Sequence, residues 1–450
     1  MVIVPLLREQ RLIAGTVSRM AELASGWLHA SVALVTTERE HADSQLAALR
    51  LPGLAAALSR GRSVARFRGV LPQDRLDALT AHAGQPAARC LKAVHAAFDA
   101  LESTPDMAAR LAGHGGWPVP VRHYHLPDPA GTMAGQVNYA ARRELERLGR
   151  PGIDPARVWL AVYNADSQPA PATLPAVTRL LGVHPDAQII QQPAVFTRSP
   201  GRNAAANGAA LLQSRWTLAR EIPRLRRQAA HTRAAPGQAR GIPPLAHCVG
   251  HGLFIRADTF IRFGGLPTET MNEDLPLGYL ACAAGVPIDP LPVLELADTP
   301  PAIADVIRQA RQWFWSYPQY PAAARLAARY GLGSSRTRAV LAAQGLARGA
   351  LWLGQSPAIA ATVALPVTTR HTKTAAVAAA GALAAYYGVP FAALAPHLHR
   401  GGAEVRCGPR ELAGGLAACL TSSIGPWWCL GQATLAKVTG TRYRHGKTER

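Results

Sequence analysis

An amide and a carboxylate follow one apolar run, in the stretch VWLAVYNADSQP at residues 158–169. The run from Val158 to Val162 predicts a buried strand. Asn164 and Asp166, two positions apart, would then point the same way from its carboxyl end. Oxygen ligands at such a strand end can bind Mg²⁺ or Mn²⁺ and a phosphorylated ligand. The alternative is a capped turn before the next helix, because Asn, Asp, Ser and Pro are ordinary turn residues.

A pair of adjacent acids lies about a hundred residues further on. Glu273 and Asp274 stand in GGLPTETMNEDLPLGYLACAAG, residues 264–285, directly before an apolar helical stretch. One interpretation is N-terminal capping, which the helix dipole favours. The other is a general base, because a carboxylate that stays ionised near a cationic metal can accept a proton from an incoming hydroxyl.

The elements that would position these side chains form an α/β pattern. MVIVPL and ASVALVTTERE are apolar runs separated by a segment with helical spacing, which predicts a βαβ opening and a parallel sheet. Residues 41 to about 120 are mostly helical in pattern. GTMAGQVNYAARRELERLG predicts an amphipathic helix, AQIIQQPAVF a strand, and CVGHGLFIRADTFIRFGGLP a short strand and a turn.

Charge and apolar content indicate a membrane partner. The chain has 450 residues, with 48 Lys and Arg against 28 Asp and Glu, a net charge of +20. Residues 349–369, 374–398 and 412–436 lack charged side chains, and each is long enough to cross a bilayer. Residues 321–450 contain 15 Lys and Arg and 3 Asp and Glu, which gives a net charge of +12 in the part of the chain that holds these runs. This pattern favours anionic lipid over nucleic acid.

The number of spans stays open. Interfacial helices or a soluble Ala-rich bundle are the alternatives to membrane insertion, because alanine is weakly hydrophobic and prolines interrupt the runs. Three spans would place the two chain ends on opposite sides, whereas the basic tail and a catalytic domain without a signal peptide both favour the cytoplasm. A further span within residues 337–353 would restore an even count.

Other polar segments have simpler interpretations. The six cysteines have no paired spacing and are expected to be reduced. His247, Cys248 and His251 could bind a transition metal, but no fourth ligand is evident. The HYH segment at 123–125 is typical of solvated loop histidines, and RLRRQAAHTRAAPGQARG, from Arg224, predicts a mobile basic loop that could touch the donor or lipid phosphate.

The ordered set of motifs resembles the membrane-bound branch of the family 2 glycosyltransferases of GT-A fold. That family has a βαβ start with a VPxxNE-like segment, a helix with an Asn-Tyr-Ala element, a strand ending in a DxD metal motif, and an ED pair after a Gly-Gly turn. IVPLLRE, GTMAGQVNYA, YNADSQP and GGLPTETMNED follow this order here. RQARQWFWSYPQYP lies where the branch has a QxxRW-like acceptor motif, and apolar helices close the chain.

The resemblance implies a role for each matching residue. Asp274 would be the catalytic base with Glu273 beside it, and Asp166 would bind the metal. The remaining positions are implied for the nucleotide sugar (Pro5, Glu9, Glu38, Asn138, Asn164) and for the acceptor (His251, Gly252, Gln312, Trp313). Two features depart from the family pattern: Asn164 replaces the first Asp of DxD, and Gln309, Arg311, Gln312 and Trp313 do not keep the QxxRW spacing.

These observations predict a GT-A domain over residues 1–320 and a membrane-associated helical region over residues 321–450. The expected activity is inverting transfer of a sugar from a nucleotide sugar, most simply a UDP-sugar, to a glycan or lipid-linked acceptor with Mg²⁺ or Mn²⁺. The expected location is the inner or plasma membrane, multi-pass, with the catalytic domain in the cytoplasm and no nucleic-acid partner. The alternatives are a catalytically inactive relative in glycan assembly and a basic protein that binds membrane or nucleic acid without catalysis.

Overall fold

The computed structural model describes residues 1–48, 51–61, 71, 73–99, 102–149, 152–201, 203–235, 238, 241–388, 391, 404–405 and 408–439. The fold is mixed α/β, and the chain forms two compact units. Among the described residues, the first unit contains Met1–Asp154 and Val162–Asp166. The second contains Pro155–Ala161 and the described residues from Ser167 onward.

Seven strands form the main sheet, in the order β3-β2-β1-β4-β7-β5-β8. In chain order they are β1 (Val2–Pro5), β2 (Val32–Thr37), β3 (Val121–Leu126), β4 (Trp159–Val162), β5 (Ile189–Gln191), β7 (Leu253–Arg256) and β8 (Ile288–Pro290). The first three pair in parallel, with Val2 opposite Val32 and Val32 opposite Val121. β5 pairs antiparallel with β7 and parallel with β8. A separate parallel pair joins β6 (Ala194–Arg198) and β9 (Glu295–Asp298).

The first unit is a βαβ arrangement that is extended by further helices. Its sheet-associated helices are α1 (Ile13–Ser25), α6 (Thr104–Gly113) and α7 (Met133–Gly149). The β1–α1–β2 and β2–α6–β3 connections both run toward the β3 edge, whereas the chain after α7 returns past β1. Right-handed crossovers therefore place α1 and α6 on one face of the strands and α7 on the other. Ile3, Val4, Ile13, Val17 and Val137 are buried in this core.

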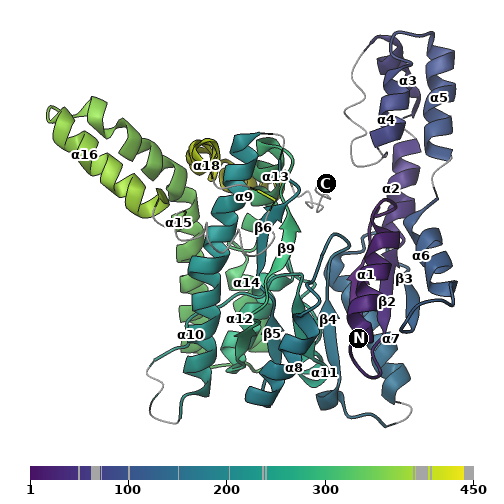
Figure 1. Cartoon of the computed structure of the whole chain (residues 1–450), viewed down its shortest axis with the longest axis horizontal. Helices are drawn as coiled ribbons and strands as arrows, with labels where there is room; N and C mark the ends of the chain where they lie inside the picture. The colour runs from purple at the N-terminus through teal and green to yellow at the C-terminus, as the bar shows by residue number, and fades with distance from the viewer. Residues whose placement is uncertain are drawn as a thin grey trace. The chain divides into compact units, whose positions relative to one another are not determined.

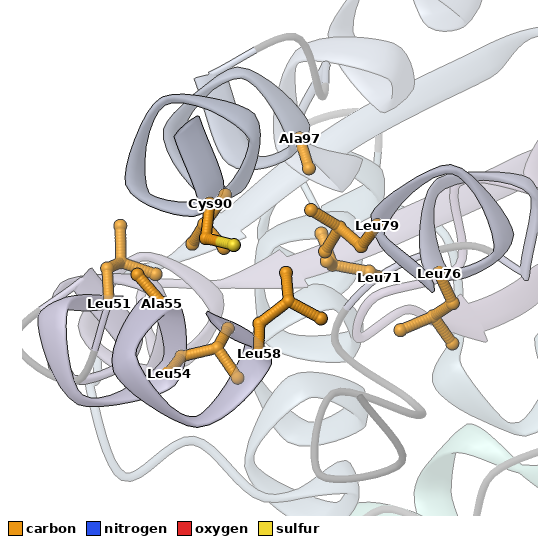
Figure 2. Close-up of a cluster of buried hydrophobic side chains, with 10 residues drawn as sticks. Leu51, Leu54, Ala55, Leu58, Leu71, Leu76, Leu79, Cys90 and Ala97 are labelled. Carbon is orange, nitrogen blue, oxygen red and sulfur yellow. The ribbon is translucent and has the colours of Figure 1, made fainter. Parts of the chain in front are cut away.

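A helical arm occupies most of the connection between β2 and β3 (Figure 1). It consists of α2 (Arg39–Ala48), α3 (Leu51–Ser59), α4 (Gln73–Thr80) and α5 (Ala87–Asp99). Figure 2 shows the separate apolar core of α3, α4 and α5, in which Leu54, Leu58, Leu79 and Cys90 point toward one another. The region is therefore mostly helical, as the sequence predicts, and the helices α3, α4 and α5 share their own apolar core.

The second unit surrounds the strands with helices. They are a short 3₁₀ turn (Pro155–Arg157), α8 (Thr173–Val183), α9 (Ala204–Trp216), α10 (Ile222–Arg233), α11 (Ala257–Arg262), α12 (Asp274–Ala284), α13 (Ile303–Phe314) and α14 (Tyr320–Arg329). A π-helical turn, Thr217–Glu221, joins α9 to α10. Leu277, Leu280 and Ile288 lie in the core of this unit.

The C-terminal helices belong to the same unit. They are α15 (Ser335–Thr368), α16 (Thr372–Leu383) followed by a π-helical turn (Ala384–Gly388), α18 (Pro409–Thr421) and α19 (Ile424–Thr439). Of the described helices, α15 alone is long and apolar enough to cross a membrane. The apolar run 412–436 is not one helix, because the chain turns at Ser422 and Ser423 between α18 and α19. Part of the run 374–398, Cys407 and the basic tail lie outside the described residues.

Four local predictions differ from the structure. The HYH segment is in β3, because its backbone pairs with β2 in register Thr36 to His125. AQIIQQPAVF is two strands that belong to different sheets and are separated at Gln192 and Pro193. The predicted turn after the strand in CVGHGLFIRADTFIRFGGLP contains the helix α11. Most of the predicted basic loop from Arg224 is α10.

Candidate active site

The segment 164–166 is held against β1 and α1 in the first unit. The backbone N–H of Tyr163 donates to the carbonyl of Ile3 at 3.1 Å. The hydroxyl of Thr16 donates to the carbonyl of Ala165. The strand ends at Val162, and the chain turns at Ala165 and Asp166. Asn164 and Asp166 are therefore not alternate residues of a strand, and strand geometry does not set the directions of their side chains. Asn164 and Asp166 are both half-buried, so both side chains retain access to a ligand.

The loop after β1 is fixed by a carboxylate that the sequence did not single out. Glu40 is buried, and its Oε2 accepts from the backbone N–H of Arg8 at 2.9 Å. Its Oε1 accepts from the side chain of Gln10 and the backbone N–H of Thr104, both at 2.9 Å. The backbone N–H of Glu9 donates to the hydroxyl of Thr104 at 3.0 Å, so Glu9 stands in an ordered loop after Pro5. Predicted nucleotide-sugar residues thus lie on a preorganised backbone.

Glu38 follows β2 and takes part in a chain of four side chains. His125 Nε2 lies 3.1 Å from Glu38 Oε2, and His125 Nδ1 lies 2.9 Å from the hydroxyl of Thr36. The same hydroxyl lies 2.7 Å from His123 Nε2. Burial, then the neighbouring charge of His125, lowers the pKa of His123. His123 and His125 are alternate residues of β3, so their side chains lie on the same side of the strand. The strand therefore places both histidines in the chain of contacts that ends at Glu38.

Helix α7 contributes a second polar contact at the same strand ends. The side-chain amide of Gln136 donates to the carbonyls of Leu6 and Val35, at 2.8 Å and 2.7 Å. Asn138 lies two residues after Gln136 on this helix and is half-buried. All six residues predicted for the nucleotide sugar and the metal therefore belong to the first unit: Pro5, Glu9, Glu38, Asn138, Asn164 and Asp166.

The acid pair lies at the start of α12 in the second unit. Glu273 is the N-cap residue and makes no side-chain capping bond. Asp274 Oδ1 accepts from the backbone N–H of Leu275 at 2.7 Å, and Oδ2 accepts from that of Gly250 at 3.3 Å. Asp274 thus stabilises the helix start and also reaches the glycine turn before β7, so capping alone does not describe its contacts.

The loop before the acid pair is fastened to α13. The side chain of Asn272 donates to the carbonyl of Gln312 at 2.9 Å and to the hydroxyl of Ser316 at 2.7 Å. The backbone N–H of Met271 donates to Gln319 at 2.9 Å. Gln312 is buried, and the ring of Trp313 lies 6.1 Å from that of Phe196. The irregular acceptor motif therefore positions the acid pair through the backbone of Gln312, while Trp313 packs on the strand pair.

The electrostatics of the pair favour one shared proton. Burial, then the charge of Asp274, raises the pKa of Glu273 to about 8. Burial also raises the pKa of Asp274, although hydrogen bonds from backbone N–H groups and the nearby His251 oppose that rise. Two adjacent carboxyls that resist double ionisation titrate as a unit. Near neutral pH the pair therefore resists the loss of both protons, and the raised pKa of Glu273 favours protonation at that residue.

His251 is held beside the pair by a buried carboxylate. Its Nδ1 lies 3.0 Å from Glu295 Oε2, and Glu295 is 1% exposed. Burial lowers the pKa of His251, but Glu295, Asp274 and Glu221 outweigh burial and raise it. Ser167 and the backbone of Gln168 also donate to Glu295. Gly252 has a φ of +62°, and a Cβ there would meet Gln192 Cβ at 2.9 Å, so this turn requires glycine.

The donor set at 164–166 suits a hard cation. Among the described residues, no group of three or more His, Cys, Asp or Glu could hold a metal ion by itself. An Asn amide oxygen and an Asp carboxylate fit Mg²⁺ or Mn²⁺, which retain waters and share their coordination with substrate phosphates. His247 Nε2 instead lies 2.7 Å from the hydroxyl of Tyr320, and Cys248 is buried with its pKa raised well above the ordinary value by burial. The HCVGHG stretch therefore holds packing and positioning residues.

Comparisons with known proteins give structural neighbours only. No family model and no curated protein matches the chain. The mannosyltransferase PcManGT from Pyrobaculum calidifontis, with GDP-Man and Mn²⁺, is similar at 16% identity over 94% of this chain and 86% of that one, with a TM-score of 0.41. S. aureus TarS 1-349 is similar at 11% identity over 98% and 92%, with TM-scores of 0.37 alone and 0.38 with UDP-GlcNAc. At these TM-scores the likeness assigns neither a family nor a function.

Proposed function

We propose that this protein is a membrane-associated, inverting glycosyltransferase that uses a nucleotide sugar, with a UDP-sugar as the expected donor. The proposal assigns donor binding to Asn164, Asp166 and the neighbouring strand ends, and proton abstraction to Asp274. The observation that carries it is the geometry of Asp274, a carboxylate that accepts from two backbone N–H groups beside Glu273, whose pKa burial raises to about 8. The acceptor is a glycan or a lipid-linked molecule.

The chemistry needs a base and a stabilised leaving group. Asp274 takes the proton of the acceptor hydroxyl as its oxygen forms a bond to the anomeric carbon. The bond from that carbon to the donor phosphate breaks, and the nucleoside diphosphate leaves with the electron pair on the opposite face. A divalent cation, when bound at Asn164 and Asp166, would neutralise the charge of the diphosphate. Glu38, Glu9, Pro5 and Asn138 orient the nucleotide in this proposal.

The C-terminal helices support the membrane association in this proposal. α15 meets the length and composition of a membrane span, and large apolar side chains on it and on α19 are exposed, including Leu351, Val367 and Val438. Large apolar side chains left exposed on a helix long enough to span a bilayer are consistent with membrane contact. The net charge of +12 from residue 321 onward favours contact with anionic lipid.

Asn164 supports a second candidate function. An amide brings no negative charge to the cation, so a catalytically inactive relative that serves as a membrane partner in glycan assembly is consistent with the same fold. The two candidates differ in turnover, and they agree in predicting affinity for a nucleotide.

The test is nucleotide release by the detergent-solubilised protein with UDP- and GDP-sugars, with Mn²⁺ or Mg²⁺ and with a chelator. We expect metal-dependent turnover that Asp166→Ala and Asp274→Asn both abolish. Glu22→Gln, an exposed position on α1, serves as the matched control and keeps wild-type turnover. Donor binding without turnover under every acceptor supplied would favour the inactive relative. Failure to bind any nucleotide sugar with either metal would overturn the proposal.

A further inference from the structure

The turn before β7, residues 249–252, brings a backbone donor to the acid pair. The N–H of Gly250 donates to Asp274 Oδ2 at 3.3 Å, while Oδ1 accepts from the N–H of Leu275, in the same helix as Asp274, at 2.7 Å. The Gly250 hydrogen bond therefore joins the proposed base to a segment outside α12. A residue that fixes this turn also fixes the direction of the Asp274 carboxylate.

Gln191, the last residue of β5, holds the turn backbone on both sides of Gly250. Its Oε1 accepts from the N–H of Val249 at 2.7 Å, and its Nε2 donates to the carbonyl of His251 at 2.9 Å. Gln191 is buried, at 1% exposure, so water does not compete for these contacts. Both ends of the side-chain amide are thus bonded to the turn, one residue before Gly250 and one residue after it.

The partners of Gln191 leave its amide one orientation. A backbone N–H can only donate and a carbonyl can only accept, so Oε1 must face Val249 and Nε2 must face His251. Nε2 also lies 3.1 Å and 3.4 Å from the carbonyl oxygens of Gln192 and Gly252. An apolar side chain of similar size would offer neither group, and the turn would lose its anchor at both ends.

The pairing of two strands places Gln191 beside the turn. β5 and β7 are antiparallel, and Gln191 pairs with Leu253, the first residue of β7. The turn that leads into β7 therefore lies at the carboxyl end of β5, where the N–H of Gln192 also donates to the carbonyl of Gly252 at 2.7 Å. In open α/β sheets this is the edge at which ligands bind.

A second contact holds a side chain of the turn rather than its backbone. His251 Nδ1 lies 3.0 Å from Glu295 Oε2, so Glu295 orients the imidazole ring. Gln191 instead contacts backbone atoms on either side of Gly250. Because the two contacts use different atoms of the turn, substitutions at Gln191 and Glu295 can separate their effects.

We propose that Gln191 is a positioning residue for catalysis, which fixes the 249–252 turn so that the Gly250 N–H keeps the Asp274 carboxylate ionised and correctly directed. A hydrogen bond from a backbone N–H favours the ionised form of a carboxylate. Removal of the Gln191 amide frees the turn and weakens that hydrogen bond. The inference rests on the proposed function, in which Asp274 takes the proton of the acceptor hydroxyl.

The test compares Gln191→Leu with Gln188→Leu in the full-length protein in detergent. Gln188 lies just before β5, and its Oε1 accepts from the hydroxyl of Thr259 at 2.9 Å, so this control removes an amide hydrogen bond at the other end of the strand. Carboxyl ¹³C NMR with labelled aspartate measures the pKa of Asp274, and Asp274→Asn assigns its signal. We expect this pKa to rise by about 0.5–1 in Gln191→Leu and to stay constant in Gln188→Leu.

Turnover gives a readout that a merely structural role would not move. The rise in the pKa of Asp274 should lower turnover about three- to tenfold on the acidic limb of the pH profile, with a much smaller loss above that limb. The KM for the donor should stay within about twofold of wild type, because Gln191 acts on the base. Thermal midpoints check folding, and Gln191→Met replaces Gln191→Leu if the leucine variant does not fold.

The titratable groups that interact with Asp274 remain in all these variants. They are Glu221, Cys248, His251, Glu273, Tyr317 and Tyr320. An unchanged pKa of Asp274 in folded Gln191→Leu, or a loss of turnover by the same factor at every pH, would overturn the positioning role. Absence of turnover by the wild type with every donor would instead overturn the proposed function, and the NMR comparison would still decide whether Gln191 acts on Asp274.

Discussion

At the scale of residues, the acid pair makes a sharp prediction about protonation. If Glu273 carries the proton at pH 7, Glu273→Gln reproduces its charge and should keep activity within about threefold of wild type. Asp274→Asn removes the base and should lower turnover by about 10²–10⁴. Nucleotide release at pH 7 measures both variants. The reverse order of losses would assign the base to Glu273.

The same pair predicts a pH dependence of stability. The pKa of Glu273 is raised to about 8 from an ordinary 4.5. Between these values the folded state holds more protons than the unfolded state, so stability should fall as pH rises from about 4.5 to 8. Glu273→Gln cannot titrate and should show a smaller fall. Thermal midpoints across this range compare the two proteins, and equal slopes would contradict the assignment.

The histidine beside the pair depends on a buried acid. Removal of the Glu295 charge should lower the pKa of His251, because Glu295 is the first of the carboxylates that raise it. NMR titration of the His251 ring in Glu295→Gln measures the shift. Glu269→Gln is the control, because Glu269 pairs with Arg329 and should leave His251 unchanged. An unchanged pKa of His251 in Glu295→Gln would show that a group other than Glu295 raises it.

The sequence singled out polar residues that lie at the end of a strand or helix. It did not single out residues whose contacts are with side chains or backbone far away in the sequence. Glu273 and Asp274 are conspicuous because they are adjacent before an apolar run. Glu40 and Glu295 contact Arg8 and His251, which are 32 and 44 residues away. Nothing local distinguishes such a carboxylate from a solvated one until the fold brings its partner to it.

At the scale of elements, one glycine controls how α19 packs on α13. A Cβ on Gly425 would lie 2.5 Å from the carbonyl oxygen of Ile307 and 2.7 Å from the backbone nitrogen of Arg311. Gly425→Ala should therefore destabilise the protein by about 1–3 kcal/mol. Gly431 on the same helix has no atom within 4 Å of its Cβ position, and Gly431→Ala should be neutral or stabilise by up to about 1 kcal/mol. Chemical denaturation distinguishes them, and equal effects would contradict the close packing.

Element prediction succeeded where periodicity was strong. β1, β2, β4 and α7 lie within the stretches expected, because their apolar runs or helical spacing are unambiguous. β3 contains His123, Tyr124 and His125 and has no apolar run, so its sequence alone does not predict a strand. Its pairing with β2 makes it one. α10 has five charged or histidine side chains among its twelve residues, and its buried Leu225 and Ala229 are too few to give a clear helical signal.

At the scale of the whole molecule, membrane insertion and surface attraction predict different salt responses. Inserted apolar helices should keep the protein with liposomes at about 1 M salt, where charge attraction is screened within about 3 Å. A peripheral basic protein should dissociate and should not bind neutral phosphatidylcholine. Flotation with neutral and anionic liposomes measures both. Release of the protein from both kinds of liposome at high salt would contradict insertion.

The packing of α9 against α18 has a consequence for synthesis. Cβ atoms on Gly208 and Gly414 would overlap the backbone of the opposite helix, and the carbonyl of Thr197 accepts from the backbone N–H groups of Glu404 and Val405. These partners are about two hundred residues apart in the sequence. The face of α9 that carries Gly208 is therefore covered only after α18 has been synthesised. During translation this face therefore stays uncovered, and a chain released before α18 is made leaves the second unit incomplete.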